Sequence, residues 1–301
     1  MELGMIGLGR MGANMTERLV RGGHRVVAFD PKEEARKRIA DKGAESVASL
    51  EALTATLRPS RTLWMMVPAG AITDTTINTL SPLLEAGDTL IDGGNSNYKD
   101  TLRRAKMAAE KQIHYVDSGT SGGVWGLDEG YSLMIGGDEA AVERLRPIFA
   151  TLAPAPDRGW GRVGPVGSGH FTKMIHNGIE YGLMQAYAEG FSILQHKHEF
   201  GLDLHQIAEI WRYGSVVRSW LLDLVADALE KNPTMNGIAP YVEDSGEGRW
   251  TLNEAIELNV STPVIALSLL ERLRSRDADS FSDKLLAAMR NEFGGHAIKS
   301  A

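Results

Sequence analysis

Short apolar segments alternate with amphipathic segments through the first half of the chain. Apolar runs that end at glycine, proline, aspartate or serine predict strands at Leu3–Leu8, Arg25–Phe29, Thr62–Val67, Thr89–Asp92 and His114–Asp117. Between them, apolar residues recur at helical spacing and predict helices at Asn14–Arg21, Glu33–Lys42 and Asp100–Lys111. This alternation is typical of an α/β fold, a doubly wound and mostly parallel sheet with helices on both faces.

The second half of the chain has a different composition. Residues 153–168 contain three prolines and four glycines, which predicts a loop and the boundary between two domains. Beyond this loop the apolar spacing is helical almost throughout, and Phe171–Lys197 contains no proline, which predicts one unusually long helix. We therefore expect an α/β domain at residues 1–165 and an all-helical domain at residues 166–301.

Composition narrows the classes of function. The formal net charge is −7, which argues against a general affinity for nucleic acid or anionic membranes. An anionic ligand would need a local set of basic side chains and backbone N–H groups. The absence of cysteine excludes disulfides and thiolate chemistry. No secretory leader or membrane-spanning run is expected, so the sequence favours a cytoplasmic protein.

The first motif is Gly7-Leu8-Gly9-Arg10-Met11-Gly12, which lies between the first predicted strand and the first helix. A G-x-G-x-x-G pattern in this position makes a tight turn where a dinucleotide pyrophosphate binds. Asp30 ends the second strand roughly 20 residues later, where an acidic residue binds the adenosine ribose. The alternative is a structural turn with an unrelated aspartate. The combined context predicts a Rossmann-type domain that prefers NAD to NADP, a preference that the nearby Lys32 would weaken.

A polar stripe lies on the predicted long helix. Its members share one face by helical spacing: Lys173, His176, Asn177, Glu180 and Tyr181. The opposite positions are apolar: Phe171, Met174, Ile175, Ile179 and Leu183. Such a stripe is usually a solvated face, yet a lysine and a carboxylate two turns apart would also fit a small substrate. Spacing alone supports both interpretations.

Several motifs, in order along the chain, resemble those of the 6-phosphogluconate dehydrogenases. They are Asp92-Gly93-Gly94-Asn95-Ser96, Ser121-Gly122-Gly123, the segment Gly167–Tyr181, Gly248-Arg249-Trp250-Thr251 and the tail Arg290–His296. The matches span the whole chain. The sequence resembles the short type of this family, since many members carry a longer helical domain.

The resemblance implies a role for each matching residue. Lys173 and Glu180 would be the catalytic groups. Nicotinamide and substrate would meet at Asn95, and the dinucleotide would also contact Val67, Pro68 and Ala69. The sugar acid would be held by Ser121, Gly122, Gly123, His176 and Asn177. Its phosphate would be bound by Tyr181, Arg274, Arg290 and His296, so the helical domain would bind substrate.

The implied reaction is the oxidative decarboxylation of 6-phosphogluconate to ribulose 5-phosphate and CO2 with reduction of NAD, in the pentose phosphate pathway. The ordinary pKa of lysine is about 10.4, so Lys173 would need burial or a nearby cation to act as a base. Electrons released on decarboxylation flow into a neighbouring carbonyl, so no metal is expected. His196 and His198 are also poorly spaced as metal ligands on a helix.

Three positions depart from the family pattern. Pro68 replaces a basic residue beside the dinucleotide. Ser245 and Glu247 stand where the family commonly has a lysine and a threonine that bind phosphate. Glu247 would have to point away from the phosphate or pair with Arg249.

Two other functions compete with this assignment. A related β-hydroxyacid dehydrogenase acting on an unphosphorylated acid would share the fold and Lys173, but it would not account for His176, Asn177, Glu180 or the tail. A non-catalytic NAD-sensing protein would be expected to lack Lys173 or Glu180.

In the family the tail reaches the phosphate bound by a neighbouring subunit, which implies a homo-oligomer, a dimer or tetramer, with shared active sites.

Overall fold

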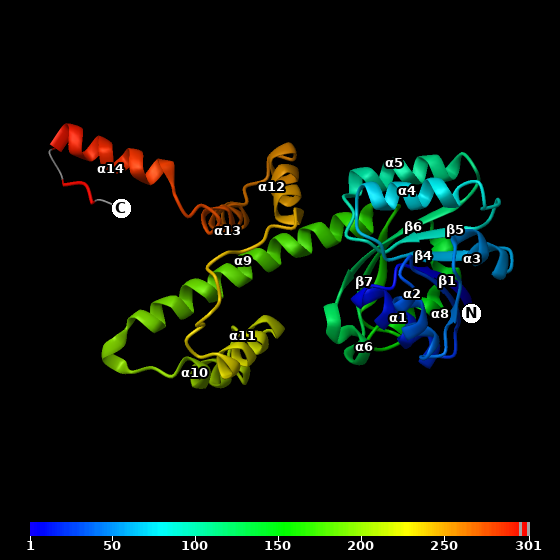
Figure 1. Ribbon diagram of the computed structural model, residues 1–301, viewed down its shortest axis with the longest axis horizontal. Helices are drawn as coiled ribbons and strands as arrows, with labels where there is room; N and C mark the ends of the chain where they lie inside the picture. The colour runs from blue at the N-terminus through cyan, green and yellow to red at the C-terminus, as the bar shows by residue number, and fades with distance from the viewer. Residues whose placement is uncertain (295–296, 300–301) are drawn as a thin grey trace. The chain divides into compact units, whose positions relative to one another are not determined.

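A computed structural model describes residues 1–294 and 297–299 of the protein (Figure 1). The chain forms two compact units, Met1–His176 and Asn177–Ala301. The helix α9 (Ser168–His196) runs across the border between them, which confirms the unusually long helix that the sequence predicts. His296 of the tail motif lies outside the described residues.

An eight-stranded sheet organises the first unit. Its strand order is β3-β2-β1-β4-β5-β6-β7-β8, and the pairs are parallel except for β6 and β7. The strands are β1 (Glu2–Ile6), β2 (Arg25–Phe29), β3 (Glu45–Ser46), β4 (Thr62–Met65), β5 (Thr89–Asp92), β6 (His114–Ser121), β7 (Ser132–Gly136) and β8 (Trp160–Gly164). From β1 the chain winds outward to β3, then returns and winds the other way from β4. The predicted doubly wound, mostly parallel sheet is therefore confirmed.

Helices cover both faces of this sheet (Figure 1). They are α1 (Arg10–Arg21), α2 (Glu33–Ala40), α3 (Leu50–Thr56), α4 (Ala71–Leu80), α5 (Tyr98–Ala109), a 3-10 turn (Gly123–Trp125), α6 (Gly126–Glu129), α7 (Glu139–Arg144) and α8 (Arg146–Leu152). Strand side chains alternate between the faces. Met5 and Trp64 pack with α1 and α8, whereas Leu63 and Leu90 pack with α3 and α4. Burial on both faces explains why these strands are apolar without interruption.

The far edge of the sheet differs from the sequence prediction. Residues 153–168 were expected to form a loop, and this is wrong for Trp160–Gly164, which forms β8. Two glycines give this segment little strand propensity of its own. Pairing with β7 and packing of the Trp160 ring 5.7 Å from that of Phe149 stabilise it instead.

In the part of the second unit that the structure describes, the regular structure is entirely helical. Besides the end of α9 it contains a 3-10 turn (His198–Phe200), α10 (Leu204–Arg212), α11 (Trp220–Lys231), α12 (Glu247–Glu257), α13 (Pro263–Arg274) and α14 (Phe281–Gly294). Ala208, Leu222 and Ala226 form a small core, against which Tyr187 and Phe191 of α9 pack. Among the described residues, no helix has the length and apolar character needed to span a membrane.

Candidate active site

The turn after β1 has the geometry that a pyrophosphate needs. Gly7 has a φ of +92°, and a Cβ there would lie 2.5 Å from the carbonyl oxygen of Met66. A Cβ on Gly12 would overlap the carbonyl oxygen of Gly7, so α1 can begin directly against the turn only with glycine here. Nothing lies within 4 Å of the Cβ position of Gly9, which precedes α1 and supplies no side-chain cap. The first N–H groups of α1 are thereby available to a phosphate, and these residues fit a bound dinucleotide.

Asp30 lies beside this turn at the carboxyl end of β2. Its carboxylate accepts hydrogen bonds from the backbone N–H groups of Leu8 and Lys32, both at 2.8 Å. Arg36 donates to the carbonyl oxygen of Asp30 at 2.7 Å, and Lys32 is exposed. The Asp30 carboxylate thus holds the glycine turn in place. The residues that follow Asp30 include two with basic side chains, Lys32 and Arg36.

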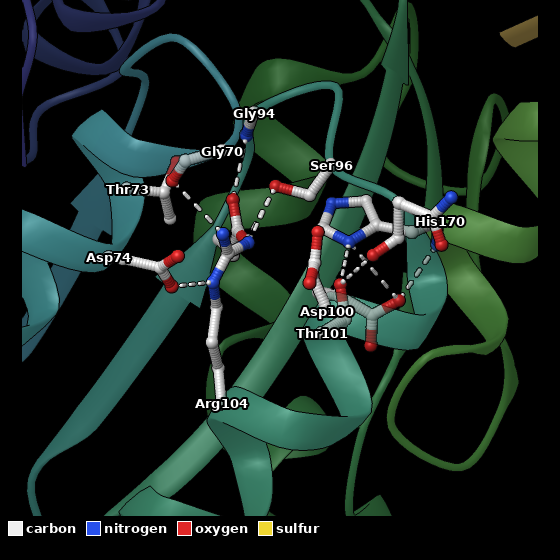
Figure 2. Close-up of polar contacts among 12 residues, drawn as sticks. Gly70, Thr73, Asp74, Gly94, Ser96, Asp100, Thr101, Arg104 and His170 are labelled. Carbon is white, nitrogen blue, oxygen red and sulfur yellow. Dashed lines mark hydrogen bonds and ion pairs between the residues drawn. The ribbon is translucent and has the colours of Figure 1, made fainter. Parts of the chain in front are cut away.

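A buried arginine joins the loops that follow β4 and β5. Arg104 of α5 is 1% exposed and donates to Asp74 of α4 at 2.8 Å (Figure 2). It also donates to the carbonyl oxygen of Gly70 and to the hydroxyl of Ser96, both at 3.2 Å. The hydrogen bond from Arg104 lowers the pKa of Asp74. One guanidinium therefore fixes the start of α4 relative to the loop before α5.

Asp92 completes this cluster at the end of β5. Its carboxylate accepts the N–H of Gly94 at 3.1 Å and the hydroxyl of Ser96 at 3.0 Å, and it lies 3.5 Å from Arg104. Asn95 lies between these two anchored residues and is exposed. The residue expected to meet nicotinamide and substrate is therefore held at the tip of a well-anchored loop.

The segment Val67–Ala69 leads from β4 toward α4. Thr73 of α4 donates its hydroxyl to the carbonyl oxygen of Pro68 at 3.0 Å, and Pro68 and Ala69 are exposed. Because α4 is also held by Arg104, this segment is anchored by the same cluster as Asn95.

Ser121, Gly122 and Gly123 form the turn at the end of β6. Gly122 and Gly123 have φ values of +137° and +53°, which would strain any other residue. Nothing lies within 4 Å of the Cβ position of Gly123, and Asn14 of α1 donates to the carbonyl oxygen of Val124 at 3.2 Å. The turn is therefore held near α1, with open backbone at its tip.

Asp117 of β6 anchors the start of α9. Its carboxylate accepts the N–H groups of Gly167 at 2.6 Å and His170 at 2.8 Å, so a strand residue caps this helix. His170 is buried, and its Nδ1 lies 2.7 Å from the hydroxyl of Thr101 on α5 (Figure 2). The first turn of α9 is thus fixed to both the sheet and a covering helix.

Lys173 lies one turn further along α9 and is 8% exposed. A Cβ on Gly119 of β6 would overlap the Cβ of Lys173, so strand and helix are in close contact there. The Nζ atom lies 3.4 Å from Nδ1 of His176. The first unit therefore brings Lys173 and His176 together. Of the other stripe residues, which belong to the second unit, Asn177 and Glu180 are half-buried.

Tyr181 belongs to a polar cluster within the second unit. It is 5% exposed, and its hydroxyl lies 3.3 Å from Oγ of Ser245. Ser245 in turn donates a hydrogen bond to Glu247, which is buried at the start of α12. Arg249 pairs with Asp244. The Glu247 carboxylate is therefore satisfied by Ser245 and not by Arg249.

The structure adds Arg272 to this cluster, a residue outside all the sequence motifs. Its guanidinium carbon lies 3.5 Å from the ring centroid of Tyr181. Arg274, which the resemblance places at the phosphate, is exposed and pairs with Asp283 at 2.8 Å. Arg290 is exposed on α14.

The doubly wound sheet, the glycine turn and Asp30 define a dinucleotide-binding protein, to which a helical unit is joined through α9. Residues 2–161 match the family model for the NAD binding domain of 6-phosphogluconate dehydrogenase, and residues 169–283 match the model for its C-terminal domain. The chain belongs to the 6-phosphogluconate dehydrogenase family.

Individual relatives agree with this membership. A putative 6-phosphogluconate dehydrogenase of Bacillus subtilis is 45% identical, with 99% of each chain covered. An NAD(+)-dependent, decarboxylating 6-phosphogluconate dehydrogenase of Haloferax volcanii is 44% identical over 99% of this chain and 98% of its own. The solved 6-phosphogluconate dehydrogenase of Plasmodium falciparum superposes with a TM-score of 0.84 at 28% identity, over 100% of this chain and 66% of that longer chain.

Proposed function

We propose that the protein oxidatively decarboxylates 6-phosphogluconate to ribulose 5-phosphate and CO2, a reaction of the pentose phosphate pathway, with NAD as the preferred hydride acceptor. The observation that carries the proposal is the placement of Lys173. It is buried on the first turns of α9, 3.4 Å from His176, and packed against the strand that leads to Ser121–Gly123. A solvated helix face would not bury its lysine in this way.

The glycine turn and Asp30 would hold the dinucleotide, with Val67–Ala69 and Asn95 at its nicotinamide end. Held there, NAD would supply the acceptor for the hydride that leaves C3 of the substrate. Ser121–Gly123 would hold the sugar acid through a hydroxyl and backbone N–H groups, and His176 and Asn177 would contact it from α9.

Lys173 would remove the proton from the C3 hydroxyl as the hydride leaves. The lysine, now protonated, would donate to the ketone oxygen while the carboxyl group leaves as CO2. Glu180 would then protonate the carbon of the resulting enediol that becomes C1 of ribulose 5-phosphate.

An assay with two products tests this proposal. The protein is incubated with NAD and 6-phosphogluconate, and NADH and CO2 are measured against a gluconate control. Equal amounts of both products are expected with the phosphorylated acid. NADH without CO2 would support a β-hydroxyacid dehydrogenase instead, and neither product would support an NAD-sensing protein.

We also infer that the chain assembles into a homo-oligomer through its helical unit. Large apolar side chains are exposed on three of its helices: Ile193 on α9, Val264, Leu267 and Leu270 on α13, and Phe281, Leu285, Leu286 and Met289 on α14. Exposed apolar surface of this extent is typical of an interface. Sedimentation should show a dimer or larger species, and Leu286→Glu should weaken it. A monomeric wild-type protein would refute the inference.

A further inference from the structure

We propose that Arg104 is a positioning residue for hydride transfer, because it fixes the loop that would contact nicotinamide relative to the loop that carries Asn95. The inference rests on the proposed function. The Arg104 side chain is 1% exposed, so it would touch neither cofactor nor substrate. It acts through the residues that directly follow each segment, since Gly70 follows Val67–Ala69 and Ser96 follows Asn95 (Figure 2).

The guanidinium of Arg104 reaches both loops at once. Nη2 donates to the carbonyl oxygen of Gly70 at 3.2 Å, and Nη1 donates to the hydroxyl of Ser96 at 3.2 Å. Nε donates to Asp74 in the first turn of α4 at 2.8 Å. The three nitrogens belong to one rigid, planar group. The distance between the two loops is therefore set by the dimensions of a guanidinium and not by a flexible chain.

A second set of hydrogen bonds holds Ser96 in place. The Asp92 carboxylate accepts the Ser96 hydroxyl at 3.0 Å and the Tyr115 hydroxyl at 3.0 Å. Burial, and then the charge of Asp92, raise the pKa of Tyr115, so its hydroxyl stays protonated and remains a donor. The Ser96 oxygen donates to Asp92 and accepts from Arg104, and the loop after β5 is thus fixed from two sides.

The helix that carries Arg104 is also connected to the proposed base. One turn before Arg104, the buried hydroxyl of Thr101 lies 2.7 Å from Nδ1 of His170 (Figure 2). His170 in turn lies one turn before Lys173 on α9. The nicotinamide loop, Asn95 and Lys173 are therefore all connected to α5. Hydride transfer depends on this alignment, because a displacement of about 1 Å can reduce a rate about 100-fold.

The test follows the first turnover with NAD and 6-phosphogluconate, measured as NADH absorbance in a stopped-flow instrument. Arg104→Met should lower the rate constant of NADH formation by about tenfold to 100-fold, because the two loops can then move independently. Arg103→Met is the matched control. Arg103 donates to the same Asp74 at 2.9 Å, and its other acceptor in the described part of the chain is Asp100. The control should stay within about twofold of the wild-type rate constant.

Arg104→Lys separates alignment from stability. A lysine keeps a positive charge near Asp74 and Asp92, but its single nitrogen cannot hold Gly70 and Ser96 together. This variant should regain most of the thermal stability that Arg104→Met loses, whereas its first-turnover rate constant should remain about fivefold or more below wild type. Unfolded molecules reduce the amplitude of the first turnover but not its rate constant, so a merely structural role would not produce this result.

Two results would overturn the inference. One is a rate constant within about twofold of wild type in Arg104→Met. The other is an Arg104→Lys variant that regains the wild-type rate constant together with its stability, because the charge and not the link between the loops would then matter. If neither variant folds, Ser96→Ala removes one loop contact, leaves every charge in place and should lower the rate constant about threefold or more; no change would overturn the inference. A wild-type protein that forms no NADH from 6-phosphogluconate would instead overturn the proposed function.

Discussion

Gly119 of β6 lies directly against Lys173 of α9. A Cβ on Gly119 would overlap the Cβ of Lys173 and would lie 2.7 Å from the carbonyl oxygen of Gly169. The backbone of the strand therefore determines how closely the helix approaches the sheet. Asp117, two residues earlier in the same strand, caps that helix. A single strand thus sets both the depth and the starting point of the helix that carries the proposed base.

Gly119→Ala should lower the free energy of unfolding by about 1–3 kcal/mol, the usual cost of overpacking. It should also lower kcat, because the added methyl group displaces Lys173. The matched control is Gly161→Ala in β8, where nothing lies within 4 Å of the Cβ position. Urea unfolding and steady-state kinetics measure both effects. If the two variants have the same free energy of unfolding and the same kcat, the contact between Gly119 and Lys173 contributes to neither stability nor catalysis.

Lys173→Met should reduce kcat by about 10³-fold or more, because it removes both a positioned base and a charge that stabilises the developing oxyanion. NAD binding, followed by fluorescence titration, should be retained. Lys197→Met is the control, since Lys197 follows the same helix but is exposed and pairs with Glu199. Activity above a few per cent of wild type in Lys173→Met would exclude this lysine as the base.

Asp30→Asn should increase kcat/KM for NADP relative to NAD by about tenfold, because the charge that repels a 2′-phosphate is removed while one acceptor oxygen remains. Asp41→Asn, at an exposed helix end, should leave the ratio unchanged. Kinetics with both cofactors measure the ratio. A wild-type protein that already prefers NADP would mean that Lys32 or Arg10 outweighs the carboxylate.

Arg104→Met should lower the free energy of unfolding by about 3–5 kcal/mol, because it leaves the buried Asp92 without its ion pair. The adjacent Arg103, half exposed and paired with Asp74, is the control, and Arg103→Met should cost at most about 1 kcal/mol. If both variants lose a similar free energy of unfolding, the buried cluster around Arg104 contributes no more to stability than an ion pair on the surface.

The same cluster predicts a pH dependence. Arg104 lowers the pKa of Asp74, so the stability gained from this carboxylate is complete above its ordinary pKa and is lost as the pH falls through the lowered value. The Arg104→Met variant should therefore lose less additional stability on acidification than the wild-type protein does. Unfolding curves at a series of acidic pH values measure the difference, and parallel curves would contradict it.

Co-expression tests whether the tail serves a neighbouring subunit. Chains carrying Lys173→Ala or Arg290→Ala should each be almost inactive alone. In a mixed oligomer, one site would combine an intact Lys173 with an intact Arg290 from the neighbour, so activity should return. Purified mixed oligomers that stay inactive would show that the tail acts on its own subunit, whereas an Arg290→Ala chain that is active alone would show that Arg290 has no role.

Much of the fold follows from local pattern. β2 and β5 begin and end where the apolar runs predict, and the long proline-free segment forms α9. β8 could not be predicted, because its two glycines and flanking prolines are typical of a loop and only pairing with β7 makes it a strand. Local sequence carries no information about such a partner.

The residues of the candidate site also divide into those that the sequence predicts and those that only the structure reveals. Residues in recurrent motifs, such as Gly7–Gly12, were predicted because their spacing reflects chemistry. The sequence patterns do not indicate Arg104, Asp117 or Arg272, because each is recognised only by its contacts with residues distant in the sequence. One signal did exist. Arg104 occupies the inward stripe of α5 together with Thr101 and Ala108, where a charged residue indicates a buried partner.

The two hydrogen bonds accepted by Asp30 limit how cofactor choice can evolve in this protein. The carboxylate that would discriminate between dinucleotides also ties the glycine turn to the segment after β2. A mutation that removes both carboxylate oxygens of residue 30 would loosen the glycine turn, whichever cofactor is bound. Lineages that change preference should therefore retain an acceptor at position 30 and acquire basic side chains around it, so selection would act first on exposed neighbours such as Lys32.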